Sequence, residues 1–166
     1  PQNGHMTEPE MPLRTGLPAI VGANPRVLIL GSFPSEKSLD TGEYYANTRN
    51  QFWRLLGSVV GFDAELPYAA RIDAVTDAGV ALWDVVYSCR RVGSLDANID
   101  RKTLVLNDFH TFLAEHPTIE RGFVNGLTAY TLFQQADIGL PAARLPSSSG
   151  ALTMSFADKL AVWQVV

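Results

Sequence analysis

Four short apolar runs, separated by segments of helical spacing, constrain the fold of this chain more than any other feature. The first run, residues 26–30, is apolar from its second residue and ends at Gly31, which is typical of a buried parallel strand. The other strand-like runs are residues 80–86, 119–124 and 142–145, and helical spacing occurs at residues 50–60, 67–77, 104–115, 126–135 and 156–166. Strands that alternate with helices predict an α/β domain with a mostly parallel sheet.

The length and composition of the chain fit one such domain. It has 166 residues, of which 46% are hydrophobic and 18% are charged, so it can bury a core. We expect residues 25–166 to form the domain, and residues 1–24 to be a remnant of cloning (residues 1–5) followed by an extended surface segment. The chain lacks a run of about 18 apolar residues, which predicts no membrane partner. We expect a monomer in the cytoplasm.

The sequence contains a single cysteine, Cys89. One cysteine excludes an intramolecular disulfide framework, a cysteine-rich zinc site and a four-cysteine iron–sulfur cluster. His110 and His116 have no partner at the spacing of metal ligands. We therefore expect no metal, no iron–sulfur cluster and no other cofactor. The formal net charge of −4 argues against nucleic acid wrapped over the whole surface, but it leaves room for a small phosphate-binding patch.

Polar and turn-forming residues follow the ends of the strand-like runs, at residues 31–34, Asp84, Asn125 and residues 146–149. Because the carboxyl ends of parallel strands meet at one edge of a sheet, we expect a binding site there. The segment after the first run contains neither a P-loop, nor a dinucleotide fingerprint, nor a nucleophile elbow. Residues 44–53 instead combine aromatic rings with amides, which suits a planar heterocycle. The alternative is that Asn50 only caps the following helix.

Seven short motifs follow one another in the order in which they occur in a known family. They are Gly31-Ser-Phe-Pro, Tyr44-Tyr-Ala, Asn50-x-Phe-Trp, Leu82-Trp-Asp-Val, Cys89-x-Arg-x-Gly-Ser-Leu-Asp, Asn125-Gly and Leu145-Pro-Ser-Ser-Ser. Together they span almost the whole domain. The chain resembles the uracil-DNA glycosylase superfamily, and within it most resembles the hypoxanthine (deoxyinosine)-DNA glycosylase family. It departs from the pattern at Leu145, where most of the superfamily has His, and at Gly150, where the hypoxanthine family has Pro.

The resemblance implies a three-layer α/β/α fold around a four-stranded parallel sheet. It also implies a DNA repair glycosylase that flips a deaminated base, hypoxanthine or uracil, out of damaged DNA and hydrolyses its N-glycosidic bond. By the same resemblance, Tyr45 stacks on the base and Asn125 reads its edge. Phe33 stands where mismatch-type relatives carry a catalytic Asn, and Asn50 matches the asparagine that takes over catalysis in the hypoxanthine family.

The other predicted site residues surround these four. Backbone N–H groups around Ser32 and Phe33 are expected to assist catalysis. In the loop of residues 145–152, which the resemblance places in the minor groove, Ser147 is expected to contact the substrate. The other residues of this loop are expected to contact the surrounding DNA. Ser148 and Ser149 would bind phosphates, and Ala151 or Leu152 would fill the gap that the flipped base leaves in the stack.

Other interpretations of the same residues remain open at this point. A serine hydrolase could use Ser32 or Ser147, but it needs a histidine base near the strand ends. A catalytically silent module could bind nucleic acid or nucleotides with the same fold. Lys37 could form a Schiff base, although we expect a monofunctional enzyme, and Asp96 is expected to brace a loop or cap a helix. A basic rim is expected from Arg49, Arg90, Arg91 and Arg144.

Overall fold

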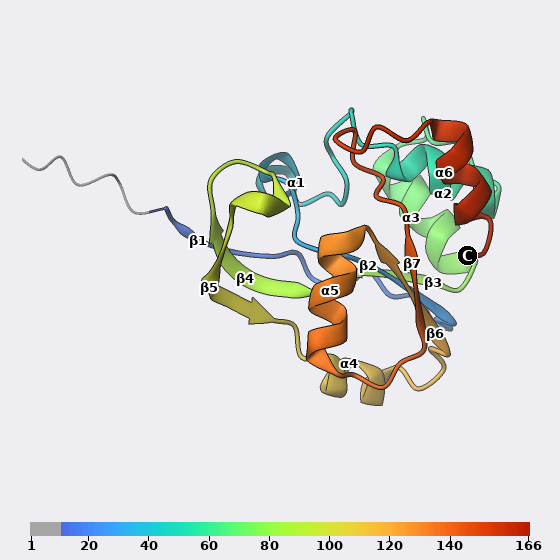
Figure 1. Ribbon diagram of the computed structural model, residues 1–166. Coiled ribbons are helices and arrows are strands. Elements are labelled where there is room, and N and C mark those ends of the chain that lie inside the picture. Colours follow the sequence, from blue (N-terminus) through green and yellow to red (C-terminus); the bar gives the residue numbers. More distant parts are fainter. Residues whose placement is uncertain (1–10) are drawn as a thin grey trace, which may run out of the picture.

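Four parallel strands form the central sheet of the computed structural model, which describes residues 11–166 (Figure 1). Their spatial order is β3-β2-β6-β7, and every neighbouring pair is parallel. The bounds are β2 (Val27–Gly31), β3 (Val80–Asp84), β6 (Arg121–Asn125) and β7 (Ala142–Leu145). The predicted α/β class and the four-stranded parallel sheet are confirmed.

Helices cover both faces of this sheet, because successive residues of each buried strand point to opposite sides. Leu28 and Leu30 of β2 pack with residues of α4 and α5, whereas Ile29 packs with residues of α2, α3 and α6. In Figure 1, α5 lies across one face and the group of α2, α3 and α6 lies on the other. The helices are α1 (Glu36–Thr41), α2 (Phe52–Val60), α3 (Tyr68–Asp77), α4 (Phe109–Glu115), α5 (Leu127–Ala136) and α6 (Phe156–Trp163).

A second, antiparallel sheet was not predicted. It has the order β1-β4-β5 and consists of β1 (Leu13–Thr15), β4 (Val86–Arg91) and β5 (Ile99–Leu106). The predicted strand at residues 80–86 is therefore two strands, which belong to different sheets and separate at Val85. The predicted helix at residues 104–115 begins only at Phe109, where Asp108 caps it by accepting a hydrogen bond from the backbone of Thr111.

The segment before residue 25 also takes part in the fold. Ile20 forms an antiparallel bridge with Leu82 of β3, so the domain extends further toward the N-terminus than predicted. The expected cloning remnant, residues 1–5, lies outside the described residues. Cys89 is fully buried, as expected. Among residues 11–166, no helix is both long and apolar enough to cross a membrane.

The loop predicted after β2 contains the short helix α1. Ser35 caps its first turn by accepting a hydrogen bond from the backbone of Ser38, and Gly42 ends it in a left-handed conformation with φ 71°. Ser38 is buried, and its hydroxyl accepts a hydrogen bond from the backbone of Ala46. This contact holds Ala46, which lies between Tyr45 and Asn50, against α1.

Candidate active site

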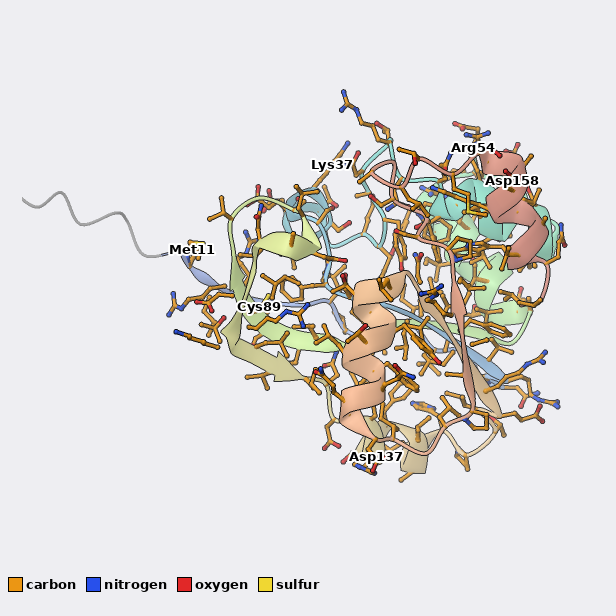
Figure 2. All side chains as sticks on the ribbon, in the orientation of Figure 1. Met11, Lys37, Arg54, Cys89, Asp137 and Asp158 are labelled. Atoms are coloured by element: carbon orange, nitrogen blue, oxygen red, sulfur yellow. The ribbon has the colours of Figure 1, made fainter. Side chains whose placement is uncertain are left out.

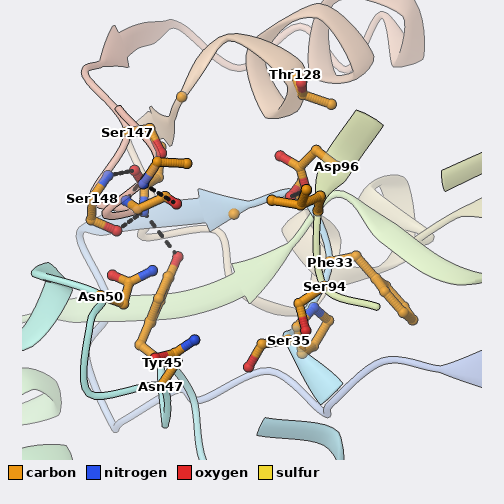
Figure 3. A pocket seen from close by; sticks show the side chains of 18 of the residues that line it. Phe33, Ser35, Tyr45, Asn47, Asn50, Ser94, Asp96, Thr128, Ser147 and Ser148 are labelled. Carbon is orange, nitrogen blue, oxygen red and sulfur yellow. Dashed lines mark hydrogen bonds between the residues drawn. The ribbon is translucent and has the colours of Figure 1, made fainter. Parts of the chain in front are cut away.

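A cleft of about 480 Å³ opens at the carboxyl ends of β2, β3 and β6. The predicted residues Tyr45, Asn50, Asn125 and Ser147 all line it, although up to 102 positions separate them in sequence. Figure 3 shows Tyr45, Asn50 and the serine loop (residues 146–150) on one side of the cleft. Asp96, Ser94 and Phe33 lie on the opposite side. The rule that places ligand sites at strand ends therefore located the cleft correctly.

Tyr45 presents an aromatic ring to the cleft from an unusual backbone conformation. Its φ is 53°, in the left-handed region that non-glycine residues seldom adopt. The ring stacks on Phe52, with ring centroids 3.7 Å apart and an interplanar angle of 11°. Burial, with a further contribution from the charge of Asp84, raises the pKa of the phenol above its ordinary value. The ring is therefore a rigid, neutral stacking surface at physiological pH.

Asn50 lines the cleft and bonds to the start of a helix. Its Oδ1 accepts a hydrogen bond of 3.0 Å from the backbone N–H of Phe52, which is the first residue of α2. Asn50 therefore bonds to the first turn of α2 from the position before the cap, which is Gln51. Since an amide oxygen has two lone pairs, this contact fixes the carboxamide while leaving one acceptor site for a water molecule.

Asn125 is fully engaged within the protein. Its Oδ1 accepts from the backbone N–H of Ser148 at 2.9 Å, and its Nδ2 donates to Ser148 Oγ at 2.8 Å and to Tyr45 Oη at 3.3 Å. Ser148 is only 1% exposed. The N–H and Oγ of Ser148 bond to Asn125, although Ser148 still contributes to the cleft lining, so its predicted phosphate contact stays a prediction. Together the two residues connect the end of β6 to the serine loop.

The neighbouring loop residues remain accessible. Ser147 and Ser149 are half-buried, whereas Ala151 and Leu152 are exposed, and all four line the cleft. The hydroxyl of Ser147 accepts from the backbone of Ser149, and the hydroxyl of Ser149 accepts from the backbone of Ala151. Both hydroxyl hydrogens can therefore still be donated to an oxygen outside the loop. The predicted contact of this loop with phosphate oxygens stays a prediction.

The two residues that follow β2 and were predicted in the site, Ser32 and Phe33, differ in their contacts. Phe33 lines the cleft but is 7% exposed and packs in the core, where the guanidinium of Arg91 lies 5.1 Å from its ring centre. The Ser32 hydroxyl donates to Asp96 at 2.7 Å. Asp96 thus braces the loop after β4, as expected, and it also faces the cleft. Burial raises the pKa of the Asp96 carboxyl.

Asp84 is a cleft residue that the site prediction omitted, although its place at a strand end gave the signal. It is the last residue of β3 and pairs with Gly31, the last residue of β2. The side chain is 5% exposed, and its buried Oδ2 has no hydrogen-bond donor among the described residues. Burial, reinforced by the negative charge of Asp96, raises the pKa of this carboxyl to about 7. Asp84 therefore exchanges its proton near neutral pH.

The arginines of the predicted basic rim do not line the cleft itself. None of the described residues that line it is a lysine, an arginine or a histidine. Arg91 is buried and donates to the carbonyl of Pro34, so the prediction that it joins an exposed rim is wrong. Lys37 is exposed on α1 and points away from the molecule (Figure 2). No group of His, Cys, Asp and Glu within residues 11–166 could hold a metal ion.

Comparison with known proteins identifies the family. The model of the uracil DNA glycosylase superfamily matches residues 18–165. The chain belongs to this superfamily. Two curated relatives are named hypoxanthine DNA glycosylase: one from Methanosarcina acetivorans, 32% identical over 93% of this chain and 98% of the relative, and one from Methanosarcina barkeri, 33% identical over 90% and 95%.

A solved structure agrees with these matches. The solution NMR structure of a protein from Methanosarcina acetivorans, described as a candidate uracil DNA glycosylase, superposes with a TM-score of 0.80. It is 31% identical and covers 93% of this chain and 96% of that chain. The predicted resemblance is thereby confirmed, as is the enzyme class, a DNA glycosylase.

Proposed function

We propose that this glycosylase removes a deaminated base, hypoxanthine or uracil, from damaged DNA. The observation that carries the proposal is the convergence of a stacking ring, a fixed carboxamide and a serine loop on one cleft. Two relatives that cover nearly the whole chain bear the name hypoxanthine DNA glycosylase, which favours hypoxanthine as the first substrate to test. A base within a duplex reaches such a cleft only after it is flipped out of the stack.

The flipped base would lie against the free face of the Tyr45 ring. The other face is occupied by Phe52, so the tyrosine cannot tilt away without breaking that stack. Stacking of this kind contributes roughly 1–3 kcal/mol per base and tolerates different bases. The predicted role of Asn125 as a reader of the base edge needs modification. Since Ser148 occupies its amide, its primary role is to fix the loop and the Tyr45 hydroxyl.

The proposed reaction is attack of water on C1′ of the deoxyribose. The C1′–N bond breaks, its electron pair leaves with the base, and the departing anion is then protonated. The Oδ1 of Asn50, fixed by the N–H of Phe52, would orient the water. Positive charge develops on the sugar in the transition state, and an ionised Asp84 at the base of the cleft would stabilise it. Backbone N–H groups near Ser32 would assist the departing base.

The same arrangement supports a monofunctional enzyme. A glycosylase that also cuts the strand needs an amine nucleophile at C1′. Lys37 does not line the cleft, and neither does any other lysine among the described residues. The serine hydrolase interpretation fails for a similar reason, because His110 and His116 are absent from the described cleft lining. We further propose that the enzyme acts as a monomer in the cytoplasm without a cofactor.

Release of free base from lesion-containing oligonucleotides tests the proposal. Single- and double-stranded DNA carrying hypoxanthine, uracil or xanthine is incubated with the wild type, with Asn50→Ala and with Asn24→Ala, an exposed asparagine far from the cleft lining. We expect release by the wild type and by Asn24→Ala, but not by Asn50→Ala. Binding of DNA without release of any base would instead support the silent binding module.

A further inference from the structure

The most deeply buried cation of the domain lies directly behind the serine loop. Lys159 of α6 is 0% exposed. Its Nζ donates to the carbonyl of Ser149 at 3.0 Å and to Oε1 of Gln51 at 2.9 Å. Both acceptors are uncharged. The two ion pairs found within residues 11–166 join other side chains, so no carboxylate there neutralises this ammonium.

A second donor on the same helix fixes the other end of the loop. Trp163, one helical turn after Lys159, donates from Nε1 to the carbonyl of Pro146 at 3.0 Å. Between them, the carbonyl of Ser148 accepts from the backbone N–H of Gln51 at 2.9 Å. Three carbonyl groups of the loop thus point into the protein. The hydroxyls of Ser147 and Ser149 remain toward the cleft.

The distribution of charge around the cleft indicates that Lys159 does more than pack against the serine loop. The described cleft lining contains Asp84 and Asp96 but no cation, although a phosphodiester carries a negative charge. An unpaired buried ammonium is unfavourable for stability, and an apolar side chain of similar size often replaces a buried charge without loss. Burial lowers the pKa of Lys159, which reflects that penalty. The ammonium bonds directly to the loop carbonyl of Ser149, and no carboxylate among the described residues neutralises it, so its charge is available to a partner of opposite charge on the other side of the loop.

We propose that Lys159 is a positioning residue that also supplies the positive charge with which the serine loop attracts a DNA phosphate. It would act from behind the loop: the serine hydroxyls donate to the phosphate oxygens while the ammonium attracts the phosphate through the Ser149 peptide. This proposal rests on the proposed function, in which Ser147 and Ser149 meet the DNA backbone. It deepens that function, because no lysine or arginine among the described residues lines the cleft itself.

Two substitutions separate the charge from the shape. Lys159→Met removes the ammonium and keeps most of the side-chain volume. Gln51→Glu keeps an acceptor for Lys159 and neutralises its charge, and Gln51 does not line the described cleft. Trp163→Phe is the matched control, since it removes a hydrogen bond to the loop without changing charge. Folding of each variant is checked by circular dichroism and thermal unfolding.

The measurement is affinity for a lesion-containing duplex as a function of salt concentration. We expect Lys159→Met and Gln51→Glu each to lower the slope of log affinity against log salt by about one, so that a loss of about tenfold at about 50 mM salt nearly vanishes at about 500 mM. Trp163→Phe should weaken binding by the same factor at every salt concentration.

Unchanged slopes for Lys159→Met and Gln51→Glu would overturn the proposal and leave Lys159 as a packing residue. A lower slope in Lys159→Met alone would also overturn it, because the shape of the side chain would then be responsible. If binding by the wild type does not depend on salt, the proposed phosphate contact of the serine loop fails together with this proposal.

Discussion

The buried carboxyl of Asp84 makes a quantitative prediction about stability. Burial and the nearby charge of Asp96 raise its pKa from an ordinary value of 3.8 to about 7. The unfolded chain exposes this carboxyl to water, where it has the ordinary value. Between about pH 4 and pH 7 the folded protein therefore carries a proton that the unfolded chain has released.

The sign and size of the effect follow from this difference. Because unfolding releases a proton in this pH range, the free energy of unfolding falls as the pH rises. Each pKa unit corresponds to about 1.4 kcal/mol, so a shift of roughly three units corresponds to a loss of about 4 kcal/mol. Asp84 is 5% exposed, and solvent therefore screens little of this effect. The contribution is complete below about pH 4 and is lost above about pH 7.

Asp84→Asn tests the calculation, since the amide has nearly the same shape and does not titrate. Urea unfolding of wild type and variant is measured at several pH values between 4 and 8. We expect similar stability near pH 4 and a variant that is more stable than the wild type by about 3–4 kcal/mol near pH 8. Comparing the two proteins cancels the titration of carboxyls that do not interact with Asp84, whereas Asp96 does interact with it and contributes to the measured pH dependence. A stability difference that does not change with pH would refute the reasoning.

Three further predictions concern activity. Asp84→Asn should release base more slowly than the wild type above about pH 7, because it cannot carry the negative charge, and its rate should lack the rise with pH that we expect for the wild type. Tyr45→Ala should lower base release at least tenfold, whereas Tyr45→Phe should keep most of it, as single-turnover assays would show. Asn125→Ala should lower both the melting temperature and activity, and Ser148→Ala should do so less, because the asparagine makes three hydrogen bonds.

The regular part of the fold could be predicted because its pattern is local. The strand at residues 142–145 was predicted with its observed bounds, and the helix at residues 67–77 differs from α3 by one residue. The separation of β3 from β4 has no such signal, because residues 80–86 are almost continuously apolar. After Asp84 the chain instead follows the segment beyond β2, with Val85 and Val86 donating to the carbonyls of Gly31 and Ser32.

The candidate site was predictable in position but not in the direction of each side chain. Residues 147–149 are three identical serines that all line the cleft, yet the middle one is buried against Asn125 while its neighbours are half-buried. No local pattern distinguishes them, since the contact spans 23 positions in sequence. Lys159 presents the same problem, because a lysine in an amphipathic helix is usually exposed. Its burial depends on a loop that only the tertiary fold places beside α6.

The strand-end glycine explains why these distant groups can meet at all. Gly31 and Asp84 are paired across neighbouring strands, and a β-carbon at Gly31 would lie 2.5 Å from Asp84 Oδ1 and 2.8 Å from Tyr45 Oη. Both distances are too short for any side chain, so the carboxyl and the phenol occupy the space that the glycine leaves. Asn125 then reaches the same phenol from the next strand. The geometry of the cleft thus depends on the absence of a side chain at Gly31, because Asp84 and Asn125 from two neighbouring strand ends and Tyr45 from the segment after α1 meet around it.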